Sequence, residues 1–195
     1  LMSSLAWAGS TTVVVGQGQG GGASCETALW DNGTGEDNAD VDINDQKETV
    51  YVGQIIQDST TRNICKVSIW VTKKAGTITS YNYQAGFVAA SSSYDFTPGS
   101  ITFADATVAG SQSWAAPGAG GTEISFTWAT PFELTANTRF AFVLTHDGAT
   151  SADNYAELEY LADGVIPGGS VYYWDVNGSD QGGVAGDIKA IFYTN

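Results

Sequence analysis

Positively charged side chains are scarce in this 195-residue chain. It has 7 lysines and arginines against 21 aspartates and glutamates, which gives a formal net charge of -14. A surface of that sign repels the phosphate backbone of nucleic acids and the anionic headgroups of membranes. No nucleic-acid partner is therefore expected. The acidic surplus fits divalent cations, and it equally fits a surface that only has to stay soluble.

Long apolar runs and helical patterns are missing as well. No apolar stretch approaches the roughly 18 residues that cross a bilayer, so membrane insertion is not expected. No segment repeats its apolar residues with the period of a helix. Gly, Ser, Thr, Asn, Tyr and Trp are abundant instead, and this composition favours strands and turns.

Histidine and cysteine are too few for several kinds of chemistry. The single histidine, His146, lies in the turn-like sequence THDG, and the chain has no GxSxG or HExxH motif. Two cysteines without CxxC spacing exclude a thiolate metal cluster. Glutamates remain as candidates for a hydrolytic pair, but Glu157 and Glu159 flank Leu158 in a pattern typical of a solvated outer strand face. We therefore predict that the protein is not an enzyme.

The two cysteines, Cys25 and Cys65, lie in different segments. Cys65 alternates with Val67, Ile69 and Val71, which predicts one shared strand face. This position fits a disulfide between Cys25 and Cys65, and it fits a buried free thiol equally well.

From residue 25 onward, short alternating segments are separated by turn-rich loops. Ile124, Phe126 and Trp128 alternate with polar residues, and similar patterns continue to the C-terminus. Loops between them contain pairs such as Asn177-Gly178, which suit tight turns. The pattern predicts an all-β fold, an antiparallel β-sandwich formed by one domain over residues 25–195.

Residues 1–24 differ from this body. An apolar segment is followed by the glycine-rich stretch GQGQGGGAS, which predicts an N-terminal arm and a flexible linker. A lone strand cannot satisfy its own backbone groups, so the arm needs a docking edge in its own sheet or in a neighbouring subunit. An alternative is that Ala6-Trp7-Ala8 is the cleavage site of a secretory signal. The arm residues expected to make the assembly contacts are Leu5, Trp7, Val13, Val14 and Val15.

Three stretches carry a family resemblance: ICKVSIWVTKKAGTIT, ISFTWATPFELTANTRFAFVLT, and GGSVYYWDVNG followed by GDIKAIFY. They resemble the jelly-roll domains, similar to carbohydrate-binding modules, of bacterial surface proteins and phage particle proteins. The resemblance implies an antiparallel jelly-roll β-sandwich and an extracellular, cell-surface or virion location, while one scaffold of this kind serves many functions. Related sandwiches often hold a structural calcium ion, and the resemblance implies Asp31 and Asp187 as its ligands.

Glycan binding by such a sandwich requires exposed flat aromatic rings, because rings stack on the faces of sugars. The candidates are Trp114 in the loop SQSWAAPG, and Tyr172 and Trp174 on one face of VYYWDV. Core packing or a subunit contact explains these residues as well.

Two functions of different classes follow. The first is a structural subunit of an extracellular filament, coat or virion surface, in which the arm adds a strand to another copy or to another surface subunit. The second is a glycan-binding module or adhesin, in which the arm is only a tether. Assembly is the preferred prediction, because the arm combines an apolar segment with a flexible linker.

Overall fold

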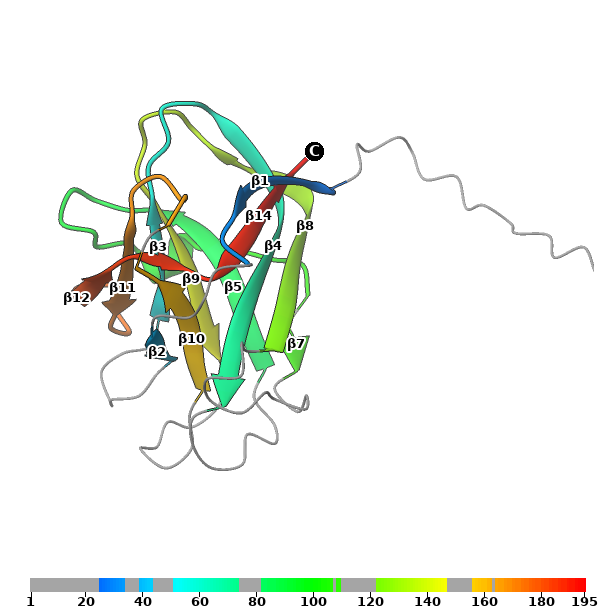
Figure 1. The fold of residues 1–195 in the computed structure, drawn as a ribbon. Coiled ribbons are helices and arrows are strands. Elements are labelled where there is room, and N and C mark those ends of the chain that lie inside the picture. Colours follow the sequence, from blue (N-terminus) through cyan, green and yellow to red (C-terminus); the bar gives the residue numbers. More distant parts are fainter. Residues whose placement is uncertain are drawn as a thin grey trace, which may run out of the picture.

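The protein folds as a β-sandwich of two antiparallel sheets (Figure 1). The structure, a computed structural model, describes residues 25–33, 39–43, 51–73, 82–106, 108–109, 122–146, 156–162 and 164–195. The prediction of an all-β sandwich is confirmed. The jelly-roll connectivity stays a prediction, and the predicted arm, residues 1–24, lies outside the described residues.

The first sheet is organised around one central strand. β4 pairs with β8 along one edge, while β14 and β10 share its other edge. β1 continues the sheet beyond β14, and β2 continues it beyond β10. Its strands are β1 (Thr27–Asp31), β2 (Ala39–Ile43), β4 (Arg62–Lys73), β8 (Thr122–Leu134), β10 (Ala156–Leu161), β13 (Asp187–Ile188) and β14 (Ala190–Thr194).

The second sheet has the order β12-β11-β3-β9-β5-β6, and β7 also pairs with β5. A short 3-10 turn, Pro98–Ser100, precedes β6. The strands of this sheet are β3 (Tyr51–Ile56), β5 (Asn82–Ala89), β6 (Thr102–Phe103), β7 (Val108–Ala109), β9 (Phe140–His146), β11 (Ser170–Trp174) and β12 (Asp180–Ala185).

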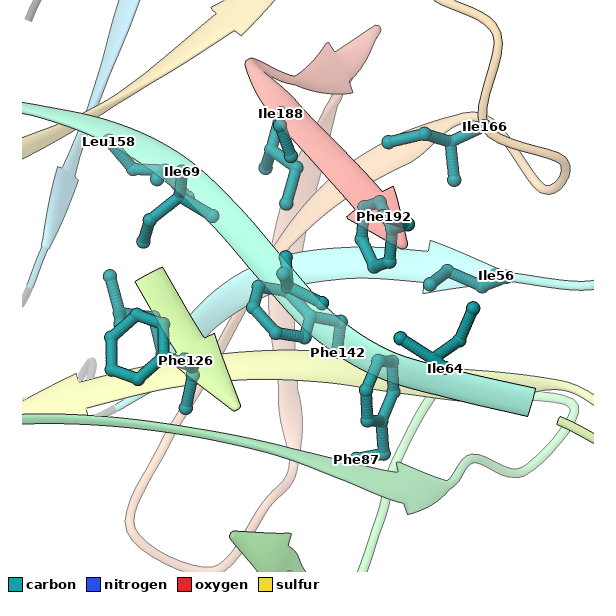
Figure 2. Close-up of a cluster of buried hydrophobic side chains, with 14 of the residues drawn as sticks. Ile56, Ile64, Ile69, Phe87, Phe126, Phe142, Leu158, Ile166, Ile188 and Phe192 are labelled. Carbon is teal, nitrogen blue, oxygen red and sulfur yellow. The ribbon is translucent and has the colours of Figure 1, made fainter. Parts of the chain in front are cut away.

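Alternating side chains from both sheets meet in one apolar core (Figure 2). Phe87 is fully buried there, and its ring lies 5.3 Å from that of Phe142 and 5.1 Å from that of Trp128, measured between centroids. Ile124, Phe126 and Trp128 are all buried, as their alternation predicts. Because period-2 patterns place every second residue inside, the sequence contains enough information to assign the inner face of these strands.

The alternation in β4 is interrupted at Cys65. In the pairing with β14, β4 advances from Ile64 to Lys66 while β14 advances by one residue, so Cys65 is the extra residue of a bulge. Ile64 therefore joins Val67 in the core cluster in place of Cys65. This corrects the prediction that Cys65 shares the face of Val67, Ile69 and Val71.

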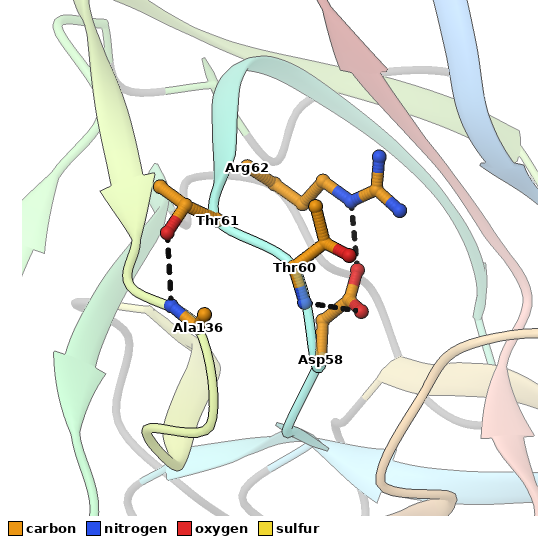
Figure 3. Close-up of polar contacts among 5 residues, drawn as sticks. All are labelled: Asp58, Thr60, Thr61, Arg62 and Ala136. Carbon is orange, nitrogen blue, oxygen red and sulfur yellow. Dashed lines mark hydrogen bonds and ion pairs between the residues drawn. The ribbon is translucent and has the colours of Figure 1, made fainter.

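Two turns are joined at one end of the sandwich (Figure 3). In the turn between β3 and β4, the carboxylate of Asp58 accepts hydrogen bonds from the Thr60 amide at 3.0 Å and from Arg62 Nε at 2.7 Å. In the turn between β8 and β9, the amide of Ala136 donates to Thr61 Oγ1 at 3.1 Å. Asp58 therefore orders a turn that also holds the neighbouring turn.

We expect Asp58→Asn to lower the free energy of unfolding by about 1 kcal/mol at neutral pH. Burial alone would raise the pKa of Asp58, but the hydrogen bonds from Arg62 and Thr60 outweigh it and hold the pKa below its ordinary value. A lowered folded-state pKa gives stability above the unfolded-state pKa, and that stability is lost as the pH falls through the folded-state value. Urea denaturation of both proteins at pH 7 and at about pH 2 measures this. A difference that persists at the lower pH would contradict the assigned cause.

Candidate functional site

A disulfide fastens the start of the described body to the central strand of the first sheet. Cys25 and Cys65 are bonded, with their Cα atoms 5.9 Å apart. Cys65 is only 2% exposed and lies in β4, whereas Cys25 precedes β1, the outermost strand beside β14. Of the two alternatives for these cysteines, the disulfide is correct. The junction with the predicted arm is therefore held by a covalent bond to β4 as well as by the hydrogen bonds of β1.

This bond also bears on the compartment of the protein. Disulfides form and persist in oxidising surroundings and are rare where thiols are kept reduced. The Cys25–Cys65 bond is thus compatible with an extracellular protein. Within the described ranges, no helix has the length and apolarity that crossing a bilayer requires.

A second feature is an aromatic cluster on the outer face of the second sheet. The segment that follows β5 carries Phe96, whose ring packs against Trp174 at 5.2 Å and against Tyr51 at 5.4 Å. Trp174 Nε1 donates a hydrogen bond of 2.8 Å to the carbonyl of Tyr94. Trp174 is consequently 0% exposed. The segment after β5 covers the ring, so in this structure Trp174 offers no exposed face on which a sugar could stack.

Tyr172 lies beside this cluster and is partly exposed. On the two neighbouring strands, Tyr172 pairs with Gly53 and with Gly183. Neither glycine has a side chain that could pack beside the tyrosine ring. A Cβ on Gly183 would lie 3.0 Å from Tyr172, which shows how closely the ring covers β12. Burial, and then the neighbouring Tyr94, raises the pKa of Tyr172. Of the predicted glycan residues that the structure describes, Tyr172 is the one that solvent reaches.

Tyr94 and Arg139 extend the surface at Tyr172. The rings of Tyr94 and Tyr172 are 4.5 Å apart, and the guanidinium carbon of Arg139 lies 4.8 Å from the centre of the Tyr94 ring. Arg139 also donates a 2.9 Å hydrogen bond to the carbonyl of Ser91, which fixes it beside the segment after β5. The sequence analysis identified neither Tyr94 nor Arg139 as a site residue. For Tyr94, the available signal was its position as an aromatic residue after three serines in SSSYDF. Trp114 lies outside the described residues.

A shallow polar pocket is formed by the same segment. Its volume is about 520 Å³. Asp95 accepts hydrogen bonds from the Asp180 amide at 2.8 Å and from the Ser93 hydroxyl at 2.7 Å, and these bonds lower its pKa. The hydrogen bond between Asp95 and the Asp180 amide attaches the segment after β5 to β12. The side chains of Ser91, Ser93 and Thr97 give the pocket a surface rich in hydroxyl groups. The pocket is lined by Ala89, Ala90, Ser91, Ser93, Asp95, Phe96 and Thr97.

The two predicted calcium ligands occupy different surroundings. Asp31 is exposed on β1, whereas Asp187 is 1% exposed. The carboxylate of Asp187 accepts hydrogen bonds from Gln54 Nε2 at 2.8 Å and from the Ile166 amide at 2.7 Å. Burial raises the pKa of Asp187, although these two bonds oppose the shift. Calcium binding by Asp31 and Asp187 stays a prediction, and the ion would have to compete with both donors.

Glu159 corrects another expectation. Instead of lying on a solvated face, its side chain is 0% exposed, and its carboxylate lies 3.1 Å from the ammonium group of Lys189. The Lys189 ammonium is in turn 5.9 Å from the centre of the Trp70 ring. Period-2 reasoning placed Glu159 on the correct side of β10, opposite Leu158, but it could not show what covers that side.

The single histidine and the possibility of a metal cluster are the remaining chemical candidates. His146 ends β9, and its ring is 5.6 Å from that of the buried Tyr83. In those ranges, no three histidine, cysteine, aspartate or glutamate side chains converge as a metal site would need. The predicted assembly residues Leu5, Trp7, Val13, Val14 and Val15 all lie outside the described part of the chain.

Comparisons with protein-family models, with curated proteins and with solved structures found no match for this chain. Its assignment as an all-β sandwich consequently depends on the strand pairing and core described above. The resemblance to jelly-roll domains that are similar to carbohydrate-binding modules stays a prediction.

Proposed function

We propose that this protein is a non-catalytic structural subunit of an extracellular filament, coat or virion surface. In this proposal the arm, residues 1–24, adds a strand to a neighbouring copy or to another surface subunit, and the sandwich is the body that is linked. A linker as rich in glycine as GQGQGGGAS is expected to bring the arm within reach of such a neighbour. The strand then obtains from the neighbour the backbone hydrogen bonds that it cannot make alone.

The Cys25–Cys65 bond is the observation that carries the proposal. β1 has five residues and an irregular register between Ala28 and Trp30, so its hydrogen bonds alone would attach the arm weakly. The disulfide connects the same point to β4, which is paired on both sides. A free N-terminal tail would gain little from a covalent bond to β4. An arm that joins the sandwich domains of two subunits gains more, because its attachment must not separate.

Removal of the arm should abolish assembly and leave the body folded. We expect protein lacking residues 1–24 to be monomeric in light scattering and to show no filaments or particles by electron microscopy. Protein lacking only residues 1–15 keeps the linker, so its failure to assemble would assign the contact to the apolar segment. Circular dichroism serves as the folding control for both proteins. The same oligomer in full-length and shortened protein would refute the proposal.

Glycan binding is the second candidate function, and Tyr172 is the observation that favours it. Tyr172 and Tyr94 form a partly exposed aromatic pair beside the hydroxyl-rich pocket, an arrangement suited to a sugar ring and its hydroxyl groups. The body without its arm should then bind a polysaccharide, and Tyr172→Ala should remove that binding. Absence of binding by the body across a broad glycan panel would eliminate this candidate.

A further inference from the structure

Two segments of the chain match the acceptor sequence for N-linked glycosylation, which is Asn-X-Ser/Thr with any residue except proline at X. The first is Asn32-Gly33-Thr34, and the second is Asn177-Gly178-Ser179. A match of three residues arises easily by chance, so the sequence alone does not distinguish an acceptor from an ordinary turn. The structure describes both asparagines and gives them different surroundings.

Asn32 has no room for a glycan. It is only 5% exposed, its backbone amide donates a 2.8 Å hydrogen bond to the carbonyl of Ala190, and its side chain donates to the carbonyl of Ile188 at 3.5 Å. The next residue, Gly33, is packed so closely that a Cβ there would lie 2.6 Å from the Trp70 ring. A glycan is bulky and has to stay in solvent, so a chain that carried one on Asn32 could not pack this segment against β4.

Asn177 lies in the turn between β11 and β12, at the surface. It is exposed, and the neighbouring Val176 is 64% exposed. The Oδ1 atom of Asp175 orders the turn by accepting hydrogen bonds from the amide of Asn177 at 2.8 Å and from the amide of Ser179 at 2.9 Å. The side-chain nitrogen of Asn177 donates to Asp175 Oδ2 at 3.4 Å, which is long for such a bond. The atom that would carry a glycan is therefore accessible and weakly held.

The turn accounts for the first two residues of this acceptor sequence, but it does not account for the third. Gly178 has a φ of +76°, and a Cβ there would collide with the carbonyl oxygen of Phe96, so the position requires glycine. Asparagine commonly precedes such a glycine. Ser179 contributes its backbone amide and carbonyl to the turn, whereas its hydroxyl makes no hydrogen bond with the described residues. A hydroxyl group that the turn does not use thus completes the acceptor sequence.

From these observations we propose that Asn177 carries an N-linked glycan and that Asn32 does not. The donor is an oligosaccharide linked to a lipid pyrophosphate. In the transfer, Asn177 Nδ2 forms a bond to the anomeric carbon of the first sugar, and the bond between that carbon and the phosphate oxygen breaks. The lipid pyrophosphate leaves with the electron pair, and the nitrogen loses one proton to a base of the transferase.

This inference goes beyond the proposed function and does not depend on assembly through the arm. The Cys25–Cys65 bond is compatible with passage through an oxidising secretory compartment, where such transferases act. The inference also separates two identical sequence signals by their burial, since both sequons share Asn-Gly and only one of them reaches solvent.

Mass spectrometry of the full chain, secreted by a eukaryotic cell, tests the proposal. Peptide N-glycosidase F removes N-glycans, and in heavy-oxygen water it converts each glycosylated asparagine to a labelled aspartate. A sample kept in the same water without the enzyme corrects for spontaneous deamidation, to which Asn-Gly sequences are prone. We expect the enzyme-dependent label at Asn177 and none at Asn32. Secreted protein without a glycan at Asn177, or folded protein with one at Asn32, would overturn the proposal.

Substitutions of Ser179 provide a matched test. Ser179→Ala removes the hydroxyl and keeps the Asn-Gly turn, so it should fold as wild type does in thermal denaturation and lose the glycan completely. Ser179→Thr retains a hydroxyl and should keep the glycan, and Thr34→Ala, which removes the other sequon, should not change it. A glycan that persists in Ser179→Ala would contradict the assignment. Protein lacking residues 1–24 should keep the glycan whether or not it assembles, so this inference and the proposed function fail independently.

Discussion

Cys25→Ser is expected to lower the free energy of unfolding by about 4 kcal/mol. The bond that it removes spans a sequence separation of 40 residues, and the entropy lost by closing such a loop in the unfolded chain gives a stabilisation of this size. Cys25 is partly exposed, so serine adds little packing cost of its own, and Cys65 keeps its place in β4. Urea denaturation measured by tryptophan fluorescence provides the value.

Reductant supplies the matched control for this prediction. Wild-type protein in reductant should lose as much stability as Cys25→Ser loses, and the variant should not respond to reductant, because it has no bond left to break. Equal stability of the oxidised and reduced wild-type proteins would show that the bond contributes nothing to folding.

Trp174→Ala is expected to destabilise the sandwich by about 3–5 kcal/mol. The indole is fully buried between the outer face of the second sheet and the segment after β5, where it packs against Phe96 and donates a hydrogen bond to Tyr94. Its removal leaves a cavity, and it also leaves a carbonyl without its donor. Thermal and urea denaturation should both show the loss.

Tyr172→Ala is the matched comparison, because Tyr172 lies on the same strand and the same face but is partly exposed. Its cost should be clearly smaller than that of Trp174→Ala, and Tyr172→Phe should be nearly neutral. Loss of glycan binding in Tyr172→Ala would therefore be informative, whereas loss in Trp174→Ala could come from unfolding. A Trp174→Ala protein as stable as wild type would show that the segment after β5 does not cover the ring in solution.

The alternation of apolar and polar residues in the sequence was sufficient to assign the inner face of regular strands. Ile124, Phe126 and Trp128 in β8 follow the strict period of a half-buried strand, and all three are buried. Cys65 breaks the period because one extra residue enters β4. No local pattern marks that insertion, since it depends on the register with β14, a strand far away in the sequence.

The candidate site was less predictable for a related reason. Tyr172 and Trp174 are equivalent in a strand pattern, and they differ only because Phe96 comes from another segment to cover one of them. Glu159 was likewise placed on the correct face, and its burial depends on contacts such as the ion pair with Lys189. What covers an outer sheet face is decided by tertiary contacts, so periodicity alone cannot distinguish a solvated position from a covered one.

The position of the disulfide has a mechanical consequence. A force applied through the N-terminal end reaches the body at Cys25 and passes directly to Cys65. β1, β2 and β3 lie between these cysteines in the sequence, so tension bypasses them while the bond is intact. The load is transferred to β4, which is hydrogen-bonded to β8 on one side and to β14 on the other, and the short strand β1 is protected from being peeled away.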